Sequence, residues 1–160
     1  MLVRGEDSLA RQLADGRQSE TALMIQRGVG RMLFTQRFSV LSELTLASGR
    51  RADLMALSPK GDFWIIEIKS SVADFKSDNK WPDYKDYCDR MFFASHEEVP
   101  ADLFPAEQGL IMADSFGADI LRDAPEHRLS AARRKAVMLR FATLAANRLH
   151  HLNDPGLSGI

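Results

Sequence analysis

Three residues have the types and the spacing that phosphodiester chemistry needs: Asp53, Glu67 and Lys69, in the pattern Asp-x13-Glu-x-Lys. Glu67 and Lys69 are two positions apart, so on a β-strand both side chains point to the same face. Asp53 lies between Ala52 and Leu54 in a short apolar segment, where a half-buried strand favours Val or Thr. This context gives the three residues more weight than the bare pattern, which often occurs by chance.

Two carboxylates held close together repel each other, and a divalent cation relieves that repulsion. Mg²⁺, or Mn²⁺ in its place, takes one or two carboxylates and fills its other positions with water and phosphate oxygens. A nearby ammonium group orients an attacking water and offsets charge on the phosphate, which gives metal-assisted phosphodiester hydrolysis. The alternative is structural: an ion pair of Lys69 with Glu67 or Asp53 at the end of a sheet.

The elements that must position these residues are three strand-like segments, 38–46, 51–57 and 63–69. Short turn signals separate them, so we predict an antiparallel meander. Pairing around the turn at 58–62 places the start of one strand beside the end of the next. The acid–lysine set should therefore meet at one end of the sheet.

Alternation along each segment predicts which side chains share a face. In the first segment the two faces are predicted to carry Phe38, Val40, Ser42, Leu44 and Leu46 on one side and Leu41, Glu43 and Thr45 on the other. In the second they carry Asp53, Met55 and Leu57 against Ala52, Leu54 and Ala56. In the third they carry Phe63, Ile65, Glu67 and Lys69 against Trp64, Ile66 and Ile68.

The rest of the chain predicts helices and shorter strands around this meander. A helix ending near Gly16 should precede a second helix over 19–36, and 70–81 is polar and loop-like with room for one helical turn. Pro82 suits the first position of a further helix, and Ser130 should cap a long final helix that ends near Leu152. Additional strands are predicted at 91–94, 110–113 and 118–121. This order indicates an α+β fold in one domain over 1–160.

The composition is that of an ordinary globular chain: 160 residues, 45% hydrophobic, 27% charged and 8% aromatic. It excludes disordered, collagen-like and disulfide-scaffold proteins, and the single cysteine, Cys88, fits a reducing compartment. No segment approaches the ~20 apolar residues of a membrane span, and the N-terminus lacks the apolar stretch of a signal peptide. We therefore expect a cytoplasmic protein with no membrane partner.

The net charge of −1 hides a pattern along the chain. Residues 1–60 carry nine Lys and Arg against six Asp and Glu, residues 61–127 carry six against fifteen, and residues 128–160 carry six against one. An acidic middle between basic ends is what a carboxylate site in basic surroundings would produce. The alternative is a solvated surface whose charges happen to cluster.

The residues now described resemble a known family. Asp53 followed by Glu67-Ile68-Lys69 on a strand–turn–strand resembles the PD-(D/E)xK nuclease superfamily, although Ala52 stands where a proline often precedes the aspartate. The runs 74–94 and 129–142 resemble the MmcB-like DNA repair proteins of bacteria, and the likeness covers roughly 19–150. It implies a restriction-endonuclease-like fold, with a central mixed sheet flanked by helices on both sides.

The resemblance also implies roles for residues of the site. Asp53 and Glu67 would be metal ligands together with the Ile68 carbonyl, and Lys69 would position the water. A further carboxylate is expected from Glu20 in the first helix or from Glu43.

The neighbourhood of the site supplies further candidates. Asp74, Asp78 and Lys80 directly follow the site strand, where they would touch metal or phosphate or else serve as helix caps and solvated loop. Trp81 is a packed hinge or a base-stacking platform. The basic and aromatic residues expected to contact nucleic acid are Arg50, Arg51, Lys76, Lys80, Trp81, Arg133, Arg134 and Lys135, with a solvated helix face as the alternative for the last three.

These observations predict a Mg²⁺-dependent DNA endonuclease or DNA-processing enzyme of repair, acting on structured or damaged DNA. The first alternative is a catalytically silent module of the same fold that binds DNA structures or recruits a repair partner. A protein-interaction scaffold is the second. The sequence leaves open whether the protein forms a homodimer and which repair protein it meets.

Overall fold

The computed structural model describes residues 6–157, which form one open six-stranded sheet with strand order β1-β2-β3-β4-β5-β6. The first three strands pair antiparallel, β4 and β5 run parallel to β3, and β6 is antiparallel to β5. The strands are β1 (Ser39–Thr45), β2 (Arg51–Leu57), β3 (Phe63–Ile68), β4 (Arg90–Ser95), β5 (Gly109–Ala113) and β6 (Ala118–Arg122). The predicted meander within a mixed sheet is confirmed.

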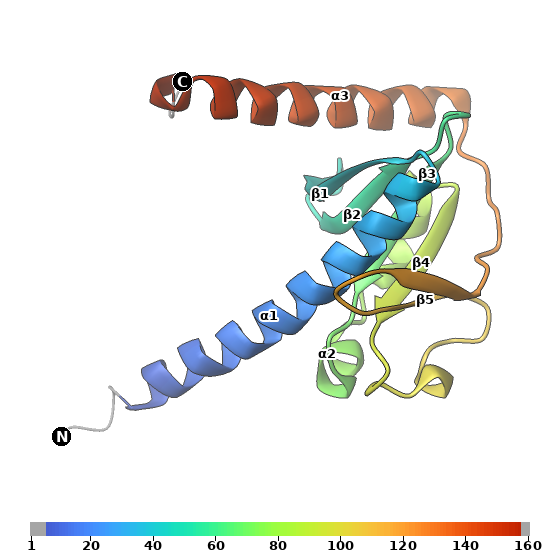
Figure 1. The fold of residues 1–160 in the computed structure, drawn as a ribbon. Helices are drawn as coiled ribbons and strands as arrows, with labels where there is room; N and C mark the ends of the chain where they lie inside the picture. The colour runs from blue at the N-terminus through green and yellow to red at the C-terminus, as the bar shows by residue number, and fades with distance from the viewer. Residues whose placement is uncertain (1–5, 158–160) are drawn as a thin grey trace.

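Helices cover both faces of this sheet, as Figure 1 shows. Helix α1 (Glu6–Thr35) packs on one face through Ile25, Val29 and Leu33. The other face is covered by Val137 and Phe141 of α3 (Ala131–Asn153) and by two short elements that follow β3, α2 (Val72–Ser77) and the 3₁₀ helix η1 (Trp81–Tyr87). The remaining helical elements are the 3₁₀ helices η2 (Ala101–Leu103) and η3 (Pro155–Leu157).

Two of the predicted helices differ from the structure. The break near Gly16 is wrong, because α1 is continuous from Glu6 to Thr35. One glycine costs a helix only about 1 kcal/mol, too little to end it without a further stop signal. The helix predicted from Pro82 is the short 3₁₀ helix η1, while the predicted N-cap Ser130 is confirmed, its Oγ accepting the Arg133 N–H at 3.2 Å.

The alternation predicted for β1 and β2 is wrong at one place in each strand. Leu44 packs in the core beneath α3, whereas Val40 packs against the core beneath α1, so the two do not share a face. Between them Glu43 has a positive φ of 54°, and after it the side chains of β1 lie on the opposite face from the one that strict alternation predicts. In β2, Ala52 and Leu54 likewise lie in different cores, and the change falls at Asp53. Strand β3 keeps the predicted faces throughout.

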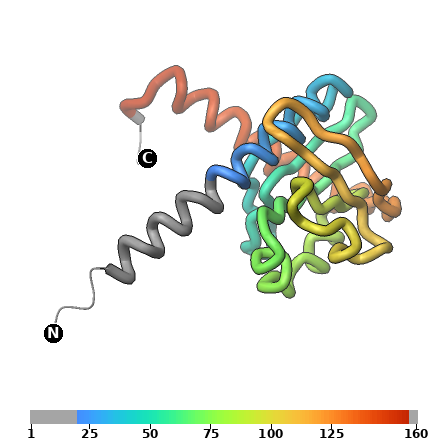
Figure 2. The backbone as a smooth tube through the Cα atoms, turned by 60° about the horizontal axis from the view of Figure 1, so that its bottom comes forward, coloured from blue at the N-terminus to red at the C-terminus, as the bar shows by residue number. Residues whose placement is uncertain are grey.

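The C-terminal half of α3 extends past the sheet, as the two views in Figures 1 and 2 agree. Within the described chain, no helix has the length and apolar character that crossing a membrane requires.

Replacing Gly28 by alanine is expected to destabilise the protein by about 1–3 kcal/mol, because the close contact between α1 and the β5–β6 turn leaves no room for a methyl group. A Cβ at Gly28 would lie 2.5 Å from the Gly117 carbonyl oxygen and closer still to that of Asp114. Gly30→Ala is the matched control, since a Cβ there meets nothing within 4 Å. Thermal unfolding should show the first variant destabilised and the second unchanged or up to about 1 kcal/mol more stable. Equal effects would contradict this account of the packing.

Candidate active site

Asp53 and Glu67 meet where β2 and β3 stop pairing through their main chains. The ladder between the strands ends at Leu54 and Ile66. Beyond it the two carboxylates replace backbone acceptors: Glu67 Oε1 accepts the Asp53 N–H at 3.1 Å, and Asp53 Oδ2 accepts the Ile68 N–H at 2.8 Å. This reciprocal pair of bonds fixes both side chains to the backbone of the neighbouring strand. The predicted meeting of the two acids is confirmed.

Burial and mutual repulsion hold protons on this acid pair. Glu67 is only 4% exposed. Burial, and next the charge of Asp53, raise its pKa from 4.5 to about 9. Burial also raises the pKa of Asp53, although the Ile68 N–H opposes the shift. The two carboxyl groups are close enough to hydrogen-bond each other. In the absence of a cation the pair therefore holds a proton at neutral pH.

Lys69 belongs to the same face of β3, and its ammonium group is held by an acid outside the pair. Lys69 Nζ lies 2.7 Å from Asp78 Oδ2, at the end of α2, and the lysine side chain is 7% exposed. Burial opposes the charge on Lys69, but the hydrogen bond and charge of Asp78 outweigh it, so the pKa of Lys69 lies above its usual value. The structural alternative from the sequence was an ion pair of Lys69 with Glu67 or Asp53. In the structure Lys69 pairs instead with Asp78, which follows the strand.

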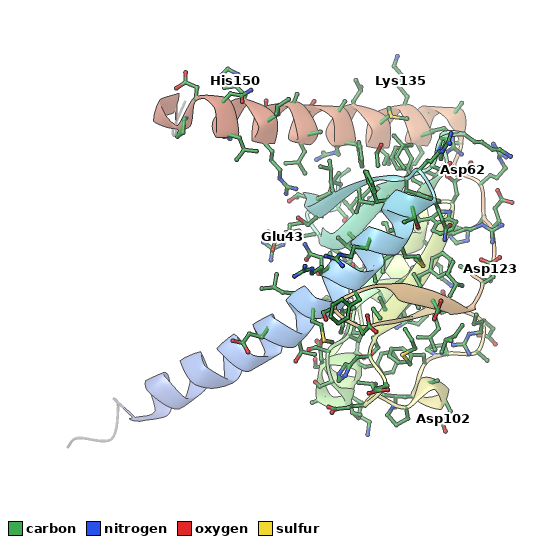
Figure 3. The ribbon with its side chains drawn as sticks, viewed as in Figure 1. Glu43, Asp62, Asp102, Asp123, Lys135 and His150 are labelled. Atoms are coloured by element: carbon green, nitrogen blue, oxygen red, sulfur yellow. The ribbon has the colours of Figure 1, made fainter. Side chains whose placement is uncertain are left out.

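A cavity of about 630 Å³ opens onto this constellation. Most of the residues that the sequence singled out contribute to its wall. The lining includes Glu43, Arg50, Arg51, Asp53, Glu67, Ile68, Lys69, Asp74, Asp78 and Lys80. Glu43 lies at the exposed edge of the sheet between the two long helices (Figure 3). Of the two candidates for a further carboxylate, Glu43 is in the cavity wall and Glu20 is not.

The other residues expected to contact nucleic acid lie outside this cavity. Trp81 packs edge-on against Phe93, with ring centroids 5.4 Å apart. Of the two roles predicted for Trp81, a packed hinge and a base-stacking platform, this contact agrees with the packed hinge. Lys76 is exposed on α2. Arg134 is bound to buried Asp89 at 2.7 Å. The two neighbours of Arg134, Arg133 and Lys135, are exposed on α3.

Sequence reasoning missed several residues of the wall and one structural ion pair. Tyr84 is buried and donates its hydroxyl to the Arg51 carbonyl at 3.0 Å, closing the cavity floor. Gln26 of α1 also lines the cavity, and no sequence pattern marks it. The ion pair joins the buried carboxylate of Asp89 to Arg134, while the adjacent Arg90 reaches Asp123.

The residues of the site can supply part of the ligand set of a hard cation. Among the residues whose side chains the structure describes, 20–156, no group of three or more His, Cys, Asp or Glu is arranged to hold a metal. Two adjacent carboxylates whose pKa values are raised by burial are nevertheless a donor set that a divalent cation would stabilise, since it would take the place of the retained proton. Mg²⁺ commonly uses one or two carboxylates and keeps several waters. The pair therefore suits a cation completed by water and substrate.

Fold and site together define a class: an α+β protein with an open mixed sheet and a carboxylate–lysine site where an antiparallel hairpin opens. This arrangement is consistent with the resemblance to the PD-(D/E)xK superfamily. The chain belongs to the MmcB-like DNA repair protein family, whose model matches residues 10–156.

One solved structure is similar over nearly its whole length. It is a protein of unknown function, SPO1766 from Silicibacter pomeroyi, 48% identical with a TM-score of 0.84. The match covers 88% of this chain and 96% of that chain. The chain matches no curated protein.

Proposed function

We propose that the protein hydrolyses DNA phosphodiester bonds with the help of Mg²⁺ or Mn²⁺ held by Asp53 and Glu67. The observation that carries this proposal is the acid pair itself. Two carboxylates are fixed to opposite strands by reciprocal hydrogen bonds of 3.1 and 2.8 Å, and burial makes their joint ionisation unfavourable. A sheet that only needed stability would not keep two such groups together, because apolar residues would replace them at no loss.

The chain's own residues supply the other parts of the reaction. Bound to the two carboxylates and the Ile68 carbonyl, the cation would polarise the phosphate and lower the pKa of a water. Lys69 places a positive charge in the cavity wall, where it would orient the water and offset phosphate charge. The exposed Arg51 and Lys80 would bind flanking phosphates. The water loses a proton as its oxygen bonds to phosphorus, the P–O bond to the sugar oxygen breaks, and that oxygen takes up a proton.

A second candidate function rests on a specific contact, the Lys69–Asp78 ion pair of 2.7 Å. An ammonium group held this way has to leave Asp78, or be shared with it, to reach a phosphate. If it stays where it is, the protein is a DNA-binding module of nuclease-like fold that cuts nothing. Such a module would bind DNA in a salt-sensitive way, through phosphate contacts, and would be indifferent to changes at Asp53.

Lys69→Ala is expected to lower the rate of DNA cleavage by about 10²-fold or more while DNA binding is kept, because the lysine acts on the water and phosphate at the cut. Cleavage of branched, nicked and single-stranded DNA with Mg²⁺, and with EDTA instead, measures the rate. Filter binding in Ca²⁺ measures affinity.

Lys60→Ala is the matched control, since it removes the same charge from an exposed position in the turn between β2 and β3, outside the cavity. It should cut at the rate of the unaltered protein. Robust cutting by Lys69→Ala would refute the catalytic role, and absence of cutting by the unaltered protein would favour the binding module.

A further inference from the structure

The charge on the molecule changes sign along the edge of the sheet that carries the candidate active site. On the β1 side arginines outnumber carboxylates. Arg50 and Arg51 line the cavity at the start of β2, where Arg50 pairs with Asp83 at 2.7 Å and the carboxylate of Glu43 is exposed. Arg140 and Arg148 of α3 reach the same side, where they donate to the Thr45 and Glu43 carbonyl oxygens at 3.4 and 3.2 Å. Within the described chain Arg51, Arg140 and Arg148 form no ion pair, so a phosphate backbone approaching from β1 meets these three cations.

On the other side of the site the charges are acidic. A second cavity, of about 770 Å³, lies beyond β3 and is lined by four carboxylates and, among the described residues, by no lysine or arginine. Within the described chain none of the four forms an ion pair. They are Glu97, Glu98, Asp114 and Asp119. A phosphate backbone there would meet these four carboxylates.

The two cavities adjoin and lie level with each other on the sheet. His96 lines the acidic cavity, and its Nε2 donates to the Ser70 carbonyl oxygen, in the wall of the site, at 2.9 Å. Pairing across β3, β4, β5 and β6 brings Asp119 to the level of Lys69, three strands away. Strands are about 4.8 Å apart, so this distance is about 14 Å.

That distance decides what a DNA strand can do after it passes the site. Neighbouring phosphates lie farther apart along a strand than the roughly 3.4 Å rise per strand of a duplex axis, so fewer than about four of them would follow the scissile bond across β4–β6. Each would face unpaired carboxylates, and like charges at this range repel within the Debye length of about 10 Å at 0.1 M salt. A strand that ends at the site avoids this cost entirely.

We propose that the cavity takes a DNA strand by its end: the polymer lies over the basic β1 side and its terminus lies at Asp53 and Glu67. Hydrolysis then releases the terminal nucleotide by the reaction given above. This inference rests on the proposed hydrolysis and adds the substrate class, a strand end as opposed to the interior of a continuous strand.

The test compares one single-stranded DNA sequence in two forms, linear and covalently closed into a circle, with Mg²⁺ at 50 mM salt. The linear form should be shortened from one end, and the circle should be cut at least about 10-fold more slowly. Equal cutting of both forms overturns the strand-end inference and leaves the hydrolysis standing. If neither form is cut, the proposed hydrolysis itself fails and the inference falls with it.

A charge variant separates electrostatics from shape. Glu97→Gln/Glu98→Gln removes two exposed charges from the acidic cavity and should raise cutting of the circle several-fold relative to the linear form. Asp62→Asn/Asp123→Asn removes two charges from the far side of the molecule (Figure 3) and should leave the ratio unchanged. Raising the salt to 200 mM should also bring the cutting rate of the circle closer to that of the linear form. A ratio that neither the first variant nor salt moves overturns the inference.

Discussion

Replacing Glu67 by glutamine is expected to lower DNA hydrolysis by about 10³-fold and, at the same time, to stabilise the metal-free protein by about 1–3 kcal/mol at pH 8. Activity falls because a neutral amide is a poor ligand for Mg²⁺. Stability rises because glutamine keeps an oxygen to accept the Asp53 N–H, adds an N–H₂ group to face the Asp53 carboxylate, and is neutral in both states, so that folding at pH 8 no longer requires the uptake of a proton. Opposite effects on activity and stability are typical of a residue kept for function.

The pH dependence gives an independent readout of the same carboxyl. Because the pKa of Glu67 is raised from 4.5 to about 9 on folding, the folded state binds a proton that the unfolded state releases. The stability that the folded protein gains from this bound proton is therefore fully present below pH 4.5 and is lost as the pH rises towards 9. Chemical denaturation of the unaltered, metal-free protein should show falling stability over this window, and Glu67→Gln should show a flatter curve. Mg²⁺ should restore stability at pH 8 in the unaltered protein only.

Glu43→Gln is the control for this experiment. It removes a carboxylate from the same cavity at an exposed position, so its stability should change by no more than about 0.5 kcal/mol. A Glu67→Gln protein that is less stable than the unaltered protein at pH 8, or that still cuts DNA, contradicts the role given to the acid pair.

Strand β3 shows what the sequence alone predicts well. Its period-two alternation is uninterrupted, and the turn at 58–62 fixes the register with β2, so Asp53 and Glu67 could be placed together before any coordinates. The parallel strands β4 and β5 were found from their apolar runs. The sheet and the acid pair are local consequences of pattern and turn geometry.

Features that depend on one residue's backbone or on distant segments were not predictable. The left-handed Glu43 moves Leu44 to the other core, and nothing in the side-chain pattern marks a positive φ at a glutamate. The partner of Lys69 depends on where the short helix α2 brings Asp78 back to the strand. Arg134 resembles its basic neighbours in sequence and differs from them only because α3 docks over Asp89.

Arg134→Met is expected to destabilise the protein by about 2–4 kcal/mol, because it leaves the Asp89 carboxylate buried without its counter-charge. Asp89 is 1% exposed and accepts two bonds from Arg134, at 2.7 and 2.8 Å, besides the Phe63 and Leu129 N–H groups. Methionine is about as good a helix former as arginine, so the helix itself should not suffer.

Lys135→Met separates this structural role from the DNA contact that the sequence suggested for all three basic residues of α3. Lys135 is exposed, and its loss should change stability by no more than about 0.5 kcal/mol. Burial raises the pKa of Asp89, but the hydrogen bonds from Arg134 outweigh burial and hold the pKa below 3.8. The stabilisation that this ion pair gives the folded protein is therefore present above pH 3.8 and fades as the pH falls below it. The deficit of Arg134→Met should therefore be full at pH 7 and shrink at pH 3, because its Asp89 can take up a proton. If Arg134→Met unfolds like the unaltered protein at pH 7 but binds DNA weakly, Arg134 belongs to the nucleic-acid surface. The ion pair with Asp89 would then not be what stabilises the docking of α3.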